Sequence, residues 1–300
     1  MSHLVVLIAT RNRWSLLHDC LESLQRMHLP DHVSCSIRVV DNGSEEPAWQ
    51  ALQRYARERH RMPVEVQREP IPGKSRALNR GLTGMQADYL AFTDDDMLMD
   101  AGWAAAVVSH FEACSCGGLN GRIDLSLPGP APEWFTDNCA ELLGSTHARS
   151  PGQALRGLMG GNMAVRAKLL PRIGPFRHDL GPAGKRFASA EDMEWSGRLL
   201  TLGERLCFCP VALNFHRIEP FRVRQRYLWW RQFEYSRAET LGHGRSSVVG
   251  MLQACRHLAG SALIRRRAFK GFDHALEIAA LAGRVWGMLQ ARWLSGETLP

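Results

Sequence analysis

The chain has 300 residues, a hydrophobic content of 45% and a formal net charge of +7. This composition is ordinary for a globular protein, and the length allows one large α/β domain or a domain with an appendage. No run of about 18 uncharged apolar residues is present, which argues against a spanning helix. An apolar strand begins almost at the amino terminus, so we expect no signal peptide.

The positive charge is concentrated towards the carboxyl terminus. Residues 217–300 contain 14 Lys and Arg against 6 Asp and Glu, whereas residues 1–216 contain 23 against 24. We therefore predict two parts, a nearly neutral domain over residues 1–216 and a basic helical extension over residues 217–300.

The 8 cysteines show no CxxC pair, no zinc-site spacing and no Cys/His cluster along the sequence. Cys114 and Cys116 stand in apolar surroundings, as do Cys207 and Cys209, which is typical of buried free thiols. This pattern predicts free thiols and a reducing cytoplasm.

Apolar runs and turn signals predict alternating strands and helices in the first hundred residues. Strands are expected at 4–9, 36–40, 64–66 and 89–93, and helices at 15–26, 47–59 and 74–84. Right-handed crossovers between such elements give a mainly parallel sheet flanked by helices, which is an α/β fold.

The pattern is looser after Trp103. Loops are expected at 125–132 and 182–189, a short apolar stretch at 163–165, a helix at 191–200 and a last strand at 206–215. His216 would end that last strand.

Three adjacent carboxylates, those of Asp94, Asp95 and Asp96, follow the strand at 89–93. Like charges this close repel one another unless a cation neutralises them. Hard divalent cations bind carboxylates and phosphates together, and open α/β sheets place ligands at the carboxyl ends of their strands. The triplet therefore predicts a metal–diphosphate site, with a solvated acidic turn as the alternative.

Further polar motifs recur at the expected strand and helix ends. In chain order the whole set is Ile8-Ala-Thr-Arg-Asn12, Val40-Asp-Asn-Gly-Ser44, Gly73-Lys-Ser-Arg-Ala-Leu-Asn79, Asp94–Asp96, Gly160-Gly-Asn162 and Glu191-Asp192. In order and spacing these motifs resemble those of the family 2 glycosyltransferases, inverting enzymes of the Rossmann-like GT-A fold. The resemblance covers about residues 3 to 216.

The resemblance implies transfer of a sugar from a nucleotide-sugar donor, UDP-linked above all, to an acceptor hydroxyl in polysaccharide or glycoconjugate biosynthesis. The acceptor would be a carbohydrate or a lipid-linked molecule. Residues implied for nucleotide-sugar binding are Thr10, Arg11, Asn12, Asp41, Lys74, Arg76, Asn79, Asp94, Asp95, Gly161 and Asn162. Asp41 would accept a hydrogen bond from the base, and Lys74 would face the phosphates from a helix start. A plain turn and a solvated helix face are the respective alternatives.

The resemblance also implies a metal ion and a general base. Asp96 would ligate Mg²⁺ or Mn²⁺, and His216 would either support that site or be a packed histidine. Asp192 would deprotonate the acceptor, which a single inverting displacement requires, or else cap its helix. Glu191 and Trp195 are implied for acceptor binding.

The tail is expected to form two or three helices. Four arginines stand among tryptophans in it, at 222, 224, 226 and 231. They predict contact with an anionic membrane surface, or else helices that pack on the catalytic domain. The enzyme would then be cytoplasmic and peripheral on the inner face of the membrane.

Two other functions remain as alternatives. Nucleic-acid binding through the arginine-rich tail is one, but no recognised motif supports it and we expect no nucleic-acid partner. A GT-A-type nucleotidyltransferase is the other, and it would need a glycine-rich first turn, whereas residues 10–14 contain no glycine.

Overall fold

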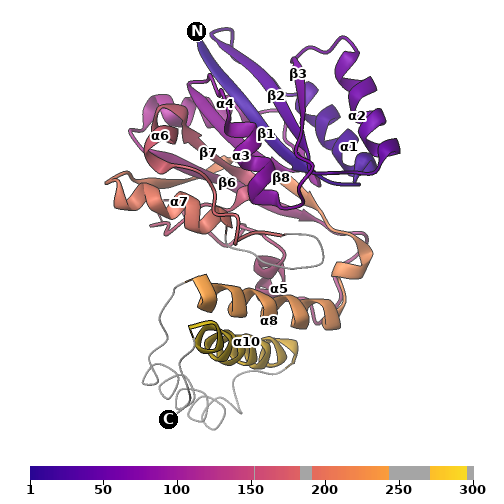
Figure 1. Cartoon of the computed structure of the whole chain (residues 1–300), viewed down its shortest axis with the longest axis vertical. Coiled ribbons are helices and arrows are strands. Elements are labelled where there is room, and N and C mark those ends of the chain that lie inside the picture. The colour runs from indigo at the N-terminus through magenta and orange to yellow at the C-terminus, as the bar shows by residue number, and fades with distance from the viewer. Residues whose placement is uncertain (152, 183–190, 243–270, 296–300) are drawn as a thin grey trace. The chain divides into compact units, whose positions relative to one another are not determined.

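The computed structural model describes residues 1–151, 153–182, 191–242 and 271–295. The chain divides into two compact units (Figure 1). The first is drawn from residues 1–126, 144–186 and 191–217, and the second from residues 127–143, 187–190 and 218–300. The segment 127–143 thus groups with the tail, although it lies inside the predicted amino-terminal domain.

The first unit is built on an eight-stranded sheet with the order β3-β2-β1-β4-β7-β6-β8-β5. The strands are β1 (Ser2–Thr10), β2 (Val33–Asp41), β3 (Val64–Arg68), β4 (Tyr89–Asp94), β5 (Met97–Met99), β6 (Gly118–Ser126), β7 (Met163–Arg166) and β8 (Leu206–Arg217). The first four run parallel, as predicted, and β6 runs parallel to β8. Strands β7 and β5 are antiparallel to their neighbours, so the sheet is mixed.

Helices cover both faces of this sheet. They are α1 (Trp14–Gln25), α2 (Glu46–Arg57), α3 (Lys74–Leu82), α4 (Trp103–Ala113), α6 (Leu170–Ile173) and α7 (Glu191–Thr201), with short 3₁₀ turns η1 (Gly160–Asn162) and η2 (Ala167–Leu169). Helices α1, α2 and α4 share one apolar cluster with the sheet, and α3, α6 and α7 share the other. Alternate residues of β1 enter the two clusters, which explains its continuous apolar sequence.

Helix α4 and strand β6 are among the described elements that the sequence pattern did not predict. Helix α4 reads Trp-Ala-Ala-Ala-Val-Val, and it buries Trp103, Val107 and Phe111 against the sheet. An element that is apolar on most sides shows little helical periodicity, so the pattern was uninformative there. Strand β8 also extends one residue beyond His216, which lies within the strand rather than at its end.

The parallel pairing brings the polar strand ends together. In the register of the sheet Thr10 lies opposite Asp41, and Ala9 lies opposite Asp94. Because β1, β2 and β4 point the same way, these ends meet at one edge, where open α/β sheets place their ligands. This confirms the predicted common edge.

The prediction that the chain has no Cys/His cluster is wrong. The candidate ligand atoms of His110, Cys114, Cys116 and Cys207 all lie within 4.8 Å of one another. The end of α4 and the start of β8, about ninety residues apart in sequence, meet in the fold and bring them together. All described cysteines are free thiols, as predicted.

The second unit is helical where it is described. It contains α5 (Asp137–Leu142), η3 (Pro220–Arg222), α8 (Gln225–Gly242) and α10 (Phe272–Ser295), and α8 packs along α10 (Figure 1). The pair is close because α10 presents glycine to α8: a Cβ on Gly283 would lie 2.1 Å from the carbonyl oxygen of Phe233. A third predicted tail helix and most of the predicted loop at 182–189 lie outside the described residues.

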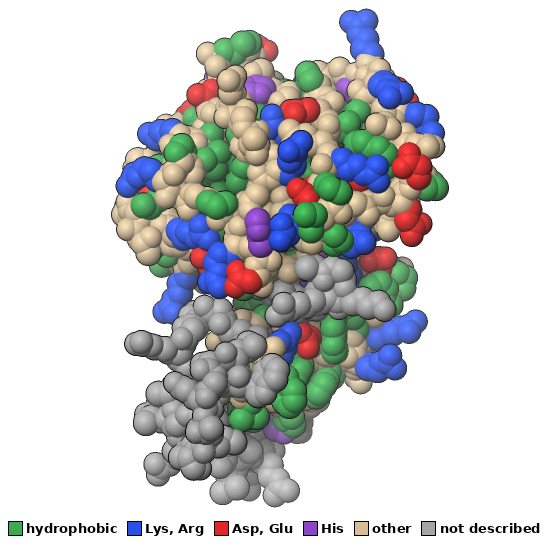
Figure 2. Space-filling view, viewed as in Figure 1, with side chains coloured by type: hydrophobic (Ala, Val, Ile, Leu, Met, Phe, Trp, Pro, Cys, Tyr) green, Lys and Arg blue, Asp and Glu red, His purple; other side chains and the backbone are tan. Residues whose placement is uncertain are grey.

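Large hydrophobic side chains remain exposed on this helix pair, and Figure 2 shows hydrophobic side chains gathered over it. They include Trp229 and Trp230 of α8 and Trp286 of α10. No helix in the described part of the chain combines the length and the hydrophobicity that crossing a bilayer demands.

Candidate active site

The acidic triplet lies where β4 turns into β5. Asp94 ends the strand, and Asp95 and Asp96 form the turn, each only 4% exposed. Buried carboxylates need hydrogen-bond or ionic partners, because desolvation of their charge is costly. Thr10 supplies one such partner, since its hydroxyl donates to Asp95 Oδ2 at 2.7 Å.

Arg13 supplies the cation that the triplet requires in this structure. Its Nη1 lies 2.6 Å from Asp95 Oδ1 and its Nη2 lies 2.8 Å from Asp96 Oδ2. One planar guanidinium therefore bridges two neighbouring carboxylates, a geometry that lysine cannot reproduce. Sequence reasoning assigned no role to Arg13. The sequence does contain one indication of this role: Arg13 is a second arginine in the turn after β1 and immediately precedes the first residue of α1.

Burial dominates the electrostatics of Asp95. It raises the pKa of this carboxyl to about 7, with a further contribution from the charge of Asp96, and Arg13 and the Thr10 hydroxyl only partly oppose it. A cation delivered to this edge would favour the ionised form and would displace the proton.

Lys74, the first residue of α3, faces the triplet from the other side. Its Nζ lies 2.6 Å from Asp94 Oδ1 and 3.5 Å from Glu191 Oε1. Burial lowers the pKa of Lys74, but the negative charges of Asp94, Glu191 and Asp192 outweigh it and raise the pKa well above its ordinary value. The ammonium is therefore held charged at the point where the sheet edge and α7 meet. The backbone N–H of Lys74 donates to the carbonyl oxygen of Pro182.

Asp192 is oriented by the glycine-rich turn η1. The backbone N–H of Gly160 donates to Asp192 Oδ2 at 2.7 Å, and the N–H of Met193 donates to Oδ1 at 2.8 Å. A Cβ on Gly160 would lie 3.3 Å from the same carboxylate oxygen, so the small residue permits this approach. Next to it, a Cβ on Gly161 would lie 2.4 Å from the Met97 side chain. The backbone of η1 therefore comes close to both acidic segments.

His216 joins the triplet from β8. Its Nε2 lies 3.4 Å from Asp96 Oδ2, the same oxygen that Arg13 contacts. The Arg13 guanidinium and the His216 imidazole thus meet at one carboxylate oxygen, where a dication would find oxygen and imidazole ligands. This donor set suits Mg²⁺ or Mn²⁺.

Asp41 lies at the neighbouring strand end and is 1% exposed. The N–H of Ser44 donates to its Oδ2 at 3.1 Å, and Arg68 Nε lies 3.4 Å from the same oxygen. Arg68 in turn covers the ring of Trp49, with 5.0 Å between guanidinium carbon and ring centroid. Asn12, which has a φ of 55°, links the turns after β1 and β2 through Ser44 and the backbone of Glu45.

Several predicted ligand residues have structural roles instead. Both ends of the Asn79 amide bind the backbone of Phe176. Asn162 is 1% exposed, and its amide binds the Trp103 indole and two backbone carbonyls. Arg11 is exposed, and Arg76 is half-buried on the first turn of α3. The structure therefore does not bring Asn79 or Asn162 to the acidic triplet.

The implied acceptor contact of Trp195 needs correction. Trp195 is fully buried, stacks on Phe176 with 4.4 Å between ring centroids, and donates its indole N–H to Gly174. It belongs to the core beneath α7. Glu191 is 4% exposed and faces Lys74. Burial and the charge of Asp192 raise the pKa of Glu191, against the effect of Lys74.

The chain has relatives among known proteins. Residues 5–174 match the model of "Glycosyl transferase family 2". A curated relative, the succinoglycan biosynthesis protein ExoM of Rhizobium meliloti (strain 1021), is 24% identical over 249 residues, which cover 81% of this chain and 74% of that protein.

Solved structures share the fold. The mannosyltransferase PcManGT of Pyrobaculum calidifontis, in complex with GDP-Man and Mn²⁺, superposes with a TM-score of 0.58 at 18% identity, covering 99% of this chain and 76% of that one. S. aureus TarS 1–349 superposes with a TM-score of 0.55 at 15% identity, covering 100% and 93% of the two chains. Both likenesses concern the fold, which is the α/β architecture that the motifs predicted.

Proposed function

Because the chain belongs to glycosyl transferase family 2, we propose that this glycosyltransferase moves a sugar from a nucleoside diphosphate to an acceptor hydroxyl with inversion at the anomeric carbon. The observation that carries the proposal is the convergence of Asp94–Asp96, Lys74 and Asp192 from three separate segments on one edge of the sheet. Nucleotide-sugar transfer needs groups that neutralise a diphosphate and a base that activates a hydroxyl, and these residues provide both.

Asp96 and His216 would hold a divalent cation, with Asp95 close by. The cation would stabilise the charge that develops on the leaving nucleoside diphosphate. Lys74 pairs with Asp94, and Arg13 pairs with Asp95 and Asp96, so each cation can turn to a phosphate when a metal occupies the acidic edge. The complex of PcManGT with GDP-Man and Mn²⁺ supports a divalent metal.

Asp192 would act as the general base. The two backbone N–H groups that bind its oxygens hold the carboxylate in a fixed orientation. A carboxylate so held can accept the proton of an acceptor hydroxyl as that oxygen attacks the anomeric carbon from the face opposite the diphosphate. Inversion follows from a single displacement of this kind.

We favour UDP as the nucleotide. Among the described residues, Ser44 and Arg68 contact Oδ2 of Asp41, so Oδ1 can accept the N3–H of uracil. TarS forms complexes with UDP and with UDP-GlcNAc. The name of ExoM supports a role in polysaccharide biosynthesis, with a carbohydrate or lipid-linked acceptor.

The first test is a hydrolysis and binding screen with UDP-, GDP- and TDP-sugars. Calorimetry with UDP and Mn²⁺ should show binding to the wild type and a large loss in Asp96→Ala, because that change removes the proposed ligand. Equal affinity in the two proteins would disprove the metal role of Asp96. NMR of the transfer product should show an inverted anomeric configuration, and retention would reject the single displacement.

A further inference from the structure

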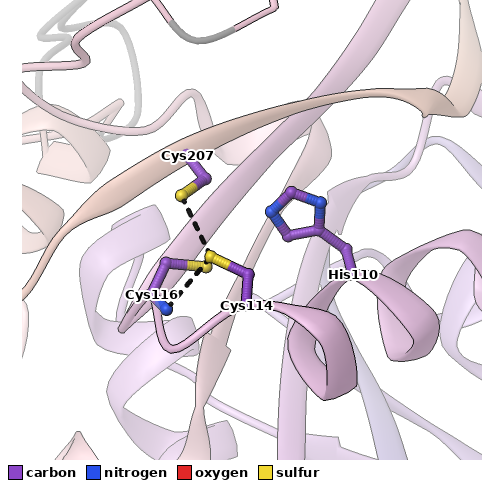
Figure 3. Close-up of side chains that lie close together, drawn as sticks. All are labelled: His110, Cys114, Cys116 and Cys207. Atoms are coloured by element: carbon purple, nitrogen blue, oxygen red, sulfur yellow. Dashed lines mark hydrogen bonds between the residues drawn. The ribbon is translucent and has the colours of Figure 1, made fainter.

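A second group of potential metal ligands lies apart from the acidic edge, where α4 ends and β8 begins. It consists of His110 in the last turn of α4, Cys114 directly after that helix, Cys116 two residues on, and Cys207 on β8 (Figure 3). Four ligand atoms within 4.8 Å of one another can enclose a single ion. Nothing in the proposed transfer reaction uses these side chains.

The backbone explains why the four side chains converge. His110 and Cys114 are four residues apart at the end of a helix and therefore share a face. Cys116 lies in the short turn before β6, and Cys207 pairs with Leu119 of that strand. Two adjacent elements thus present three sulfurs and one imidazole to the same point.

The distance between two of the sulfurs matches metal coordination. Cys114 Sγ lies 3.6 Å from Cys207 Sγ, whereas a disulfide would require about 2.0 Å. Two sulfurs that each lie about 2.3 Å from a tetrahedral ion are about 3.8 Å apart. The widest separation, up to 4.8 Å, exceeds the tetrahedral value by about 1 Å, so binding of an ion would draw the side chains together.

His110 gives an independent sign of a missing ligand. Its Nε2 is buried and has no hydrogen-bond partner among the described residues. Figure 3 shows the ring turned so that one nitrogen faces the three sulfurs. A buried imidazole nitrogen without a partner is costly, and a metal ion would satisfy it. A disulfide between Cys114 and Cys207 would leave this nitrogen unsatisfied.

Two neighbouring arginines hold the turn between α4 and β6 in place and offset the negative charge of the thiolates. The Arg166 guanidinium donates to the carbonyl oxygens of Phe111, Cys114 and Cys116 at 2.5 to 2.9 Å, which holds the turn in place. The N–H of Cys116 lies 3.4 Å from Cys114 Sγ, and such N–H groups orient metal-bound thiolates. Three thiolates and a dication leave one negative charge, and Arg205, which donates to Ser115 at 3.0 Å, lies beside it.

We infer that His110, Cys114, Cys116 and Cys207 bind one Zn²⁺ ion in a closed tetrahedral site. Soft thiolates with one imidazole select zinc over the hard cations suited to the acidic edge. Binding forms three Zn–S bonds and one Zn–N bond and releases the three thiol protons to solvent. With four protein ligands the ion has no open position, so its role is structural: it fastens the end of α4 to β8.

The test uses the full chain, purified under reducing conditions with zinc supplied and no chelator. Elemental analysis should find one zinc per chain. After removal of zinc, added Co²⁺ should give the sulfur-to-cobalt charge-transfer absorption and the visible bands of a tetrahedral site, and Zn²⁺ should abolish both. The ligands proposed at the carboxylate edge, Asp96 and His216, contain no sulfur and cannot produce the charge-transfer signal.

Cys207→Ala should lose most of the charge-transfer absorption, and His110→Ala should shift the visible bands. Cys209→Ala is the matched control, because Cys209 is buried on the same strand and lies next to α4 at Ala106, outside the group. It should bind cobalt as the wild type does. The proposal is overturned if reduced wild-type protein takes up no zinc and shows no charge-transfer absorption, or if Cys207→Ala keeps the full signal. Mass spectrometry of rapidly alkylated cells that finds Cys114 joined to Cys207 would overturn it as well.

Discussion

The guanidinium of Arg13 lies 2.8 Å from the carboxylate of Asp96, the residue to which we assign the catalytic metal. The same guanidinium reaches Asp95. In this structure an arginine therefore neutralises the triplet, a role that the sequence analysis expected a cation to fill. Arg13 and the proposed metal ion bind the same carboxylates, so the contacts of Arg13 depend on whether the metal ion is bound.

Arg13→Met should destabilise the metal-free protein by about 2 to 4 kcal/mol, because it leaves two buried carboxylates without their cation. Mn²⁺ should raise the melting temperature of this variant more than that of the wild type, since the ion replaces the lost charge. Arg11→Met, at an exposed arginine of the same turn, is the control and should change little. A thermal-shift series with and without Mn²⁺ measures both effects. Equal stability of Arg13→Met and wild type would refute the neutralising role.

Asp192→Asn should lower transfer by on the order of 10²-fold or more while donor affinity stays unchanged, because an amide cannot accept the proton. The asparagine oxygen can still accept the N–H of Gly160, so the turn η1 should keep its place. Glu194→Gln, two residues along α7 and on another face of the helix, removes only a partly exposed ion pair with Arg198 and should remain active. Initial rates measure the loss of transfer, and calorimetry measures the donor affinity. Normal turnover of Asp192→Asn would place the base elsewhere.

Asp95 should make the metal-free protein less stable as pH rises. Its pKa is about 7 in the folded protein, against 3.8 for an unperturbed carboxyl, so between about pH 4 and 7 the folded state holds a proton that the unfolded state has lost. The free energy of unfolding therefore falls across that range, by on the order of a few kcal/mol, and this contribution is constant above it.

Asp95→Asn removes this proton linkage. Relative to wild type, the variant should gain stability as pH rises from 4 to 8, as measured by denaturant titrations in the absence of divalent metal. Glu191, whose pKa is also raised by burial, contributes with the same sign and stays present in both proteins. A stability difference that does not change with pH would contradict the raised pKa of Asp95.

Trp195→Ala should lower the free energy of unfolding by about 3 to 5 kcal/mol, because it opens a cavity between Phe176 and Phe92. Trp195→Phe should cost less and should leave the KM for the acceptor unchanged, since the indole is fully buried. Denaturant unfolding and acceptor kinetics check both statements. A raised acceptor KM in an otherwise stable Trp195→Phe would restore the contact implied by the family resemblance.

The tail should bind anionic liposomes at low salt and release them as salt rises, because screened charges carry the attraction. Each exposed arginine contributes about 1 kcal/mol, so the double change Arg224→Glu and Arg226→Glu should weaken binding about 30-fold or more. The matched control reverses Arg57 and Arg59, exposed arginines near the end of α2. Sedimentation with anionic and neutral liposomes measures the difference. If both double variants lost binding equally, or if the wild type did not bind anionic liposomes, the tail would be a structural appendage.

The strands and helices of the first hundred residues could be predicted because each has a local signature. Strand β1 is a continuous apolar run buried on both faces, and α1 carries a clear apolar stripe. The common edge of Thr10, Asp41 and Asp94 then follows from right-handed crossovers alone. Local pattern and topology were sufficient there.

Partnerships between distant side chains could not be predicted in this way. Nothing in the sequence around Arg13 says that it bridges Asp95 and Asp96, because that depends on where α1 starts relative to β4. The burial of Trp195 depends on the position of Phe176, nineteen residues earlier in the chain and on another segment. The group around His110 escaped notice because Cys207 is separated from it by almost a hundred residues and two strands.

Strand β8 carries His216 near one end and Cys207 near the other. With a rise of about 3.3 Å per residue and a bulge between them, the two side chains are on the order of 25 Å apart, about three Debye lengths at physiological salt. At that separation two unit charges interact by less than about 1 kcal/mol even without screening by salt. Zinc binding near Cys207 should therefore leave the affinity for a divalent cation near His216 unchanged. The occupancies of the two metal sites can then be titrated independently.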